Sequence, residues 1–170
     1  MKLRPVLALG LAGVLLSACN SEESVPEEDV AGPEPVLTQA PQPTAAPDGT
    51  ALVAGSWNVT ENPQGASAVF GEGDAPALSI ECDAMTGTVT LDVASSSQTP
   101  EAWRIDAGGE AARLDMAPVE GGLSAEIEPG LAIFHAFSNG GETVAITSPA
   151  GERMQFPTHA GISRVLDACS

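Results

Sequence analysis

The chain has 170 residues, of which 23 are acidic and only 6 are Lys or Arg, so its formal net charge is −17 at pH 7. A polyanion of this kind is repelled by phosphate backbones and by anionic lipid headgroups, and we therefore expect no nucleic-acid partner and no electrostatic docking on a membrane surface. The length allows one domain with its own core, together with shorter attached segments.

The N-terminus has the organisation of a signal peptide. Lys2 and Arg4 precede an uncharged, mostly aliphatic stretch at residues 5–18. This stretch is shorter than the roughly 20 residues that a membrane-spanning helix needs. A basic start, a short apolar region and small residues at its end are typical of a leader that is removed after export.

The apolar stretch ends in Leu-Ser-Ala-Cys at 16–19. This run resembles the lipobox of bacterial lipoproteins, which implies removal of residues 1–18 and acylation of Cys19, usually with three fatty-acyl chains. The resemblance predicts lipidation at Cys19, a membrane partner through that lipid, and a place in the bacterial cell envelope. Asn20 stands where an Asp holds some lipoproteins at the inner membrane, which favours the outer membrane, facing the periplasm. The alternative is an ordinary signal peptide, which would leave Cys19 as a free thiol in an oxidising compartment.

Residues 19–50 have the composition of a tether. After Cys19 they contain six prolines and seven acids, no base, and few branched apolar residues, which follow no helical or strand period. Such a segment cannot bury enough apolar surface to offset its conformational entropy. We therefore expect a disordered acidic spacer that holds the following domain about 30 Å from the membrane.

Residues 51–170 carry the pattern of a small β domain. Short stretches in which apolar and polar residues alternate are separated by Gly, Pro, Asn and Asp, which predicts a mainly β fold, a small antiparallel β-sandwich or barrel. Trp57 and Trp103 fall at strand positions, and we expect both to anchor the core. The expected strands contain Trp57 and Val59; Ala66, Ala68 and Phe70; Leu78, Ile80 and Cys82; Val89, Leu91 and Val93; Trp103 and Ile105; Ala112, Leu114 and Met116; Leu123, Ala125 and Ile127; residues 142–147; and residues 153–156.

Two segments break the strand pattern. Residues 160–169 predict a C-terminal helix, because their apolar residues recur at helical spacing. These apolar residues are Ile162, Val165, Leu166 and Cys169. Residues 130–138 predict one further short helix, since Pro129 suits a helix start and Gly140 a helix end, and a strand is the alternative for this short apolar run.

Two cysteines remain after Cys19, and we expect them to form a disulfide. Cys82 lies on the apolar face of a predicted strand and Cys169 on the apolar stripe of the C-terminal helix, in a compartment that favours oxidation. A Cys82–Cys169 bond would close a long loop and stabilise the fold by about 4–5 kcal/mol in the chain-entropy model. Two buried free thiols are the alternative.

No group of residues matches a catalytic, metal-binding or cofactor-binding motif, so we expect no catalytic residues, no metal and no cofactor. His135 lies in an apolar run and His159 beside Pro157, and no Gly-x-Ser-x-Gly elbow accompanies them. Residues 71–74, or Asp83 with Asp92, do not have the spacing of a calcium loop, and we interpret them as solvated turns and strand positions.

The domain resembles uncharacterised envelope proteins of alphaproteobacteria. The resemblance covers most of the domain and lies in a Trp-x-Val strand at 57–59, Ala-Leu-Ser-Ile-Glu-Cys at 77–82, Ala-Phe-Ser-Asn-Gly at 136–140 and Arg-Val-Leu-Asp-Ala-Cys at 164–169. It implies an envelope location and no particular activity. A looser likeness, in lipobox, size, cysteine placement and acidity, connects the chain to membrane-bound inhibitors of C-type lysozymes, whose recognition motif is absent here.

These observations predict a non-enzymatic, membrane-anchored envelope lipoprotein. Its β domain would bind or support another envelope protein. A lysozyme-type enzyme inhibitor is the first alternative, because an anionic protein is complementary to a basic enzyme. A small periplasmic hydrolase is the second alternative.

Overall fold

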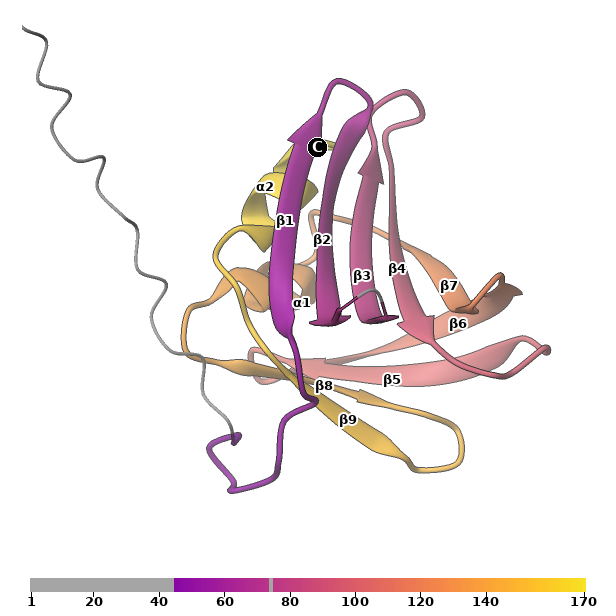
Figure 1. Cartoon of the computed structure of the whole chain (residues 1–170), viewed down its shortest axis with the longest axis vertical. Coiled ribbons are helices and arrows are strands. Elements are labelled where there is room, and N and C mark those ends of the chain that lie inside the picture. The colour runs from indigo at the N-terminus through magenta and orange to yellow at the C-terminus, as the bar shows by residue number, and fades with distance from the viewer. Residues whose placement is uncertain (1–44, 74) are drawn as a thin grey trace, which may run out of the picture. The chain divides into compact units, whose positions relative to one another are not determined.

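The computed structural model describes residues 45–73 and 75–170. The chain divides into two units, 1–39 and 40–170, and every described residue belongs to the second. The predicted leader, Cys19 and tether residues 20–44 lie outside the described residues. Within the described part, nine strands form one antiparallel sheet in the order β1-β2-β3-β4-β7-β6-β5-β8-β9 (Figure 1).

The strands follow the predicted alternation closely. They are β1 (Ser56–Asn62), β2 (Gly65–Glu72), β3 (Ala75–Asp83), β4 (Thr88–Ala94), β5 (Glu101–Ala107), β6 (Glu110–Val119), β7 (Gly122–Ile127), β8 (Thr143–Thr147) and β9 (Arg153–Pro157). β1 to β4 form a meander, and β7, β6 and β5 follow in reverse order beside β4. β7 and β6 thus lie between β4 and β5 in the sheet, although both follow β5 in the chain.

β6 joins two halves of the sheet. Its first residues pair with β5, ending at Met116 opposite Glu101, and its last three residues pair with β7. Figure 1 shows β5, β8 and β9 running across the direction of β1 to β4. The sheet is thus curled into a half-barrel, which confirms the predicted mainly β, antiparallel class.

The core lies on the inner face of this curl. Apolar positions of the alternating strands face inward, and Trp57 and Trp103 are both almost fully buried, as predicted. The two edge strands approach each other through side chains: the Trp57 indole Nε1 donates a hydrogen bond to the Pro157 carbonyl at 2.6 Å. Phe70 lies edge-on to both Trp57 and Phe156, with ring centroids 5.3 and 5.4 Å apart. Aromatic packing therefore helps to fill the space between β1 and β9.

Short helices lie at the two positions predicted for them. α1 (Ala132–His135) continues into the 3-10 helix η1 (Ala136–Ser138), so residues 132–138 are helical and not a strand. α2 (Ile162–Asp167) packs against β1, β2 and β3, and its Ile162, Val165 and Leu166 are fully buried. The predicted apolar stripe thus faces the sheet.

The predicted disulfide is present. Cys82 of β3 is bonded to Cys169, two residues after α2, with Cα atoms 5.8 Å apart. A six-residue helix is too short to be stable alone in water. The disulfide and the buried stripe therefore hold α2 on the sheet.

The six described residues of the predicted tether form a turn against β9. Ala45 pairs with Ala51, and Asp48 Oδ1 accepts the Thr50 N–H at 2.9 Å. Gln155 of β9 donates to Asp48 Oδ2 at 3.5 Å, and Ala46 is buried. In the described ranges, no helix has the length and hydropathy needed to cross a membrane.

Candidate functional site

The outer face of β1, β2, β3, β4 and β7 is polar. Because strand residues alternate between faces, the residues between the core positions all point outward. The register aligns five of them in one row across the five strands. In strand order this row is Thr60, Ser67, Glu81, Thr90 and Glu126. Hydroxyl and carboxylate groups thus follow one another along a line perpendicular to the strands.

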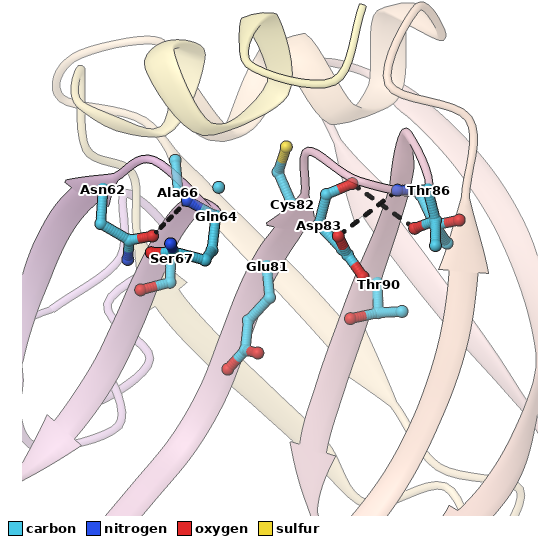
Figure 2. Close-up of a pocket in the computed structure, with 11 residues that line it drawn as sticks. Asn62, Gln64, Ala66, Ser67, Glu81, Cys82, Asp83, Thr86 and Thr90 are labelled. Carbon is cyan, nitrogen blue, oxygen red and sulfur yellow. Dashed lines mark hydrogen bonds between the residues drawn. The ribbon is translucent and has the colours of Figure 1, made fainter.

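A hollow of about 460 Å³ lies at one end of this face (Figure 2). The side chains of Glu81 and Thr90 project from the strands on one side, while the sulfur of Cys82 points to the C-terminal helix on the other. Most of its lining side chains are polar, and Ala66 and Cys82 are the apolar exceptions. Its lining residues are Asn62, Gln64, Gly65, Ala66, Ser67, Glu81, Cys82, Asp83, Thr86, Thr88 and Thr90.

Two hairpin turns form the rim of this hollow and fix its shape. In the β1–β2 turn, Asn62 Oδ1 accepts the Gln64 N–H at 2.8 Å, and in the β3–β4 turn Asp83 Oδ1 accepts the Met85 N–H at 2.8 Å. Side-chain acceptors of this kind hold turns in place. The Ala84 N–H donates to the Gln64 carbonyl at 2.9 Å and joins the two turns. The rim is therefore preformed.

Glycine at position 65 is required by this geometry. Gly65 has φ +150°, and a Cβ there would collide with the carbonyl oxygen of Cys82. Only glycine lets the start of β2 approach β3 so closely. The close approach draws the β1–β2 turn toward the β3–β4 turn.

A second hollow, of about 390 Å³, lies on the same face toward β7. Glu81 lines both hollows, and Asp92 lines the second. Ser79 Oγ donates to Asp92 Oδ2 at 3.2 Å, so this carboxylate is already oriented. Glu81 therefore occupies the centre of a polar surface that spans β2, β3 and β4.

The lining groups define what this surface can bind. Carboxylates, hydroxyls and amides line the first hollow, whereas carboxylates, one serine hydroxyl and several apolar side chains line the second. No arginine or lysine is among the lining residues of either hollow. Carboxylates are acceptors only, whereas hydroxyls and amides both donate and accept. The surface suits a cationic or hydroxyl-rich ligand.

The residues weighed for chemistry from the sequence are not brought together. His135 is exposed on α1, His159 Nδ1 accepts the Gly161 N–H at 3.1 Å, and neither lines the hollows. Asp83 accepts a hydrogen bond within the β3–β4 turn and lines the first hollow. Asp92 accepts a hydrogen bond from Ser79 and lines the second hollow. Among the described residues, no group of three His, Cys, Asp or Glu side chains could hold a metal ion.

Sequence reasoning did not single out the row through Glu81. The alternating pattern of each strand identifies its outward-facing polar residues. Which residue lies beside each of them on the next strand depends on the register, which the pattern does not give. A line of hydroxyls and carboxylates across five strands arises only once that register is known.

Comparison with known protein families, with curated proteins and with solved structures finds no match to this chain.

Proposed function

We propose that this chain is a lipid-anchored protein of the bacterial envelope, and that its β domain binds a basic partner without catalysing a reaction. The observation that carries the proposal is the preformed polar surface around Glu81, which has carboxylates and hydroxyls but no lining cation. The resemblance of residues 16–19 to a lipobox supports the anchor.

Electrostatics support a basic protein as the partner. The net charge of −17 attracts a cationic partner over long range and raises the association rate. At short range, Glu81 and Glu126 lie on the same cross-strand row on either side of Thr90. A lysine or arginine side chain placed over Thr90 would reach either carboxylate, and the neighbouring hydroxyls would accept its remaining donors.

A lysozyme-type inhibitor is a specific form of this proposal. C-type lysozymes are basic enzymes, and the acidic outer face is complementary to them in charge. The hydrolase alternative gains no support from the hollows, because no histidine lines them and a serine nucleophile needs a neighbouring base.

The experiment compares Glu81→Gln with Glu110→Gln, which removes the same charge at an exposed position outside both hollows. The full chain is purified in detergent and titrated with a fluorescent lysine-rich peptide and, separately, with a C-type lysozyme. We expect Glu81→Gln to weaken binding about five- to tenfold, as for loss of one charge-assisted contact, and Glu110→Gln to weaken it less than twofold.

The outcomes separate the forms of the proposal. Binding of lysozyme together with loss of its activity would favour the inhibitor, and binding of the basic peptide alone would favour another basic partner. Equal effects of the two substitutions would contradict the assignment of the surface, because charge alone would then explain the binding.

A further inference from the structure

The arginines of the domain are not scattered. After the predicted leader, the chain has four cations, Arg104, Arg113, Arg153 and Arg164, and no lysine. In the strand register Arg113 lies directly opposite Arg104, Arg104 lies opposite Thr147, and Thr147 lies opposite Arg153. Three of the four arginines therefore stand in one row across β6, β5, β8 and β9, which we call the arginine row.

This arrangement is unfavourable unless an anion compensates it. Like charges directly opposite each other on neighbouring strands destabilise a sheet. Arg104 is held by Asp106 at 2.6 Å and Arg113 by Asp115 at 2.8 Å. Both arginine side chains nevertheless remain more than 60% exposed, at 63% and 71%.

The aspartates leave donors available on the row. Their bonds use Nε and Nη2 of each guanidinium, and among the described residues neither Nη1 atom donates a hydrogen bond. Arg153 makes no salt bridge within the described ranges. A guanidinium has five N–H donors in a planar fork that matches carboxylates, so these groups can hold additional anions.

A hollow of about 480 Å³ lies along the row. It is bordered by Arg104 and Arg113, and small side chains form much of its remaining surface. The other lining residues are Ala102, Trp103, Ala111, Ala112, Thr147 and Ser148. The space beside the guanidinium groups therefore admits a chain with small side chains between its charges.

The chain itself shows what this face accepts. The turn at residues 45–50 lies on β9, with Ala46 buried and Asp48 bonded to Gln155. Gln155 is two residues from Arg153, whose charge also acts to lower the pKa of Asp48, after the larger effect of the hydrogen bonds from Thr50. A carboxylate of the chain itself thus already lies on β9 within the electrostatic influence of Arg153.

We propose that the arginine row binds an extended acidic peptide segment of a partner protein. Each carboxylate would pair with a guanidinium, and small residues between them would lie in the hollow along Ala102 and Ala111. An extended peptide is favoured over a membrane surface as the occupant, because the three arginines lie in a single line across four strands beside one hollow, which matches carboxylates spaced along one chain. This surface is separate from the acidic face around Glu81 and would bind acidic ligands, whereas that face would bind basic ones.

The test uses the full chain in detergent and a fluorescent peptide of alternating Glu and Ala, with the matching Gln and Ala peptide as the neutral control. The double variant Arg104→Gln with Arg113→Gln should weaken binding of the acidic peptide about tenfold at low salt. Arg164→Gln is the matched control, because Arg164 lies on α2 and pairs with Glu61 at 2.9 Å, outside the row. Binding by this variant should match the wild type.

Arg153→Gln keeps the test decisive if the double variant does not fold, because Arg153 supports no salt bridge in the described structure. It should weaken binding about threefold. Equal losses in Arg153→Gln and Arg164→Gln, or no binding of the acidic peptide by the wild type, would overturn the proposal. Tighter binding of inorganic tripolyphosphate than of the peptide would also overturn it, by showing a phosphate site instead.

Discussion

At the scale of single residues, Trp57 has a role that its hydrophobicity alone does not give. Its buried indole donates to the Pro157 carbonyl and so connects the two edge strands. Trp57→Phe keeps a ring against Phe70 but leaves that carbonyl without its donor. We expect the free energy of unfolding to fall by about 1–3 kcal/mol, measured by urea denaturation.

Trp103→Phe provides the control for this prediction. Trp103 Nε1 donates to Glu101 Oε2 at 2.8 Å in a partly buried site on its own strand, so water can replace that acceptor more easily. A loss as large as that of Trp57→Phe would show that the hydrogen bond between the edges has no special weight.

Asp106 is the residue whose ionisation depends most directly on the arginine row. The hydrogen bonds from Arg104 lower the pKa of Asp106 below its ordinary value, while burial acts in the opposite direction. Arg104→Gln should therefore raise the pKa of Asp106, followed by carboxyl NMR titration. An unchanged titration in this variant would contradict the assigned cause.

The same shift has a consequence for stability. Because the folded-state pKa of Asp106 is depressed, its pair with Arg104 stabilises the fold above the unfolded-state pKa of about 3.9. That contribution is lost as the pH falls through the folded-state pKa. Asp106→Asn should cost under about 1 kcal/mol at neutral pH, as for an exposed pair, and the difference from wild type should disappear in acid.

At the scale of elements, the C-terminal helix depends on its covalent bond to the sheet. α2 has six residues, and the disulfide joins positions 87 residues apart. Replacing both cysteines, Cys82→Ala with Cys169→Ala, removes the bond without adding a polar group to the core. We expect the unfolding free energy to fall by about 4 kcal/mol in the chain-entropy model, measured by denaturant titration.

Thiol titration of the unfolded, unreduced wild-type protein is the companion measurement. Two reactive thiols from Cys82 and Cys169 in exported protein would contradict the bond. A double alanine variant as stable as the wild type would show instead that burial of Ile162, Val165 and Leu166 is sufficient to hold α2.

At the scale of the whole molecule, the start of the domain is defined by contacts with β9. A chain that begins at Ala51 loses the buried Ala46 and the bond from Gln155 to Asp48. We expect it to be about 1 kcal/mol less stable than a chain that begins at Ala45. Equal melting curves for the two truncated chains would contradict a structural role for residues 45–50.

The lipid anchor is a second property of the whole molecule. If residues 16–19 act as a lipobox, metabolic labelling with a radioactive fatty acid should mark the wild type, and Cys19→Ala should abolish the label. Cys169→Ala is the matched control and should keep the label, since Cys169 is in the disulfide. Label that persists in Cys19→Ala, or that is absent from the wild type, would contradict the anchor.

Much of the fold follows from local sequence patterns. Most of the nine strands lie where apolar and polar residues alternate, because a period of two directs one face of each strand to the core. β8 is an exception, since Val144, Ala145 and Ile146 are consecutive and all buried. The stripe through Ile162 and Leu166 likewise predicts α2. The disulfide could be inferred because the strand pattern places Cys82, and the helix pattern places Cys169, on positions that face the same core.

The tertiary structure alone decided how these elements meet. The reversed order β7-β6-β5, the division of β6 between two partners and the meeting of Trp57 with Pro157 depend on pairings between distant residues. The row through Glu81 and the arginine row depend on register, and a slip of one residue would turn every side chain of a strand to the other face. Local periodicity determines which face a residue occupies, whereas its neighbours across the sheet are determined only when the whole chain has folded.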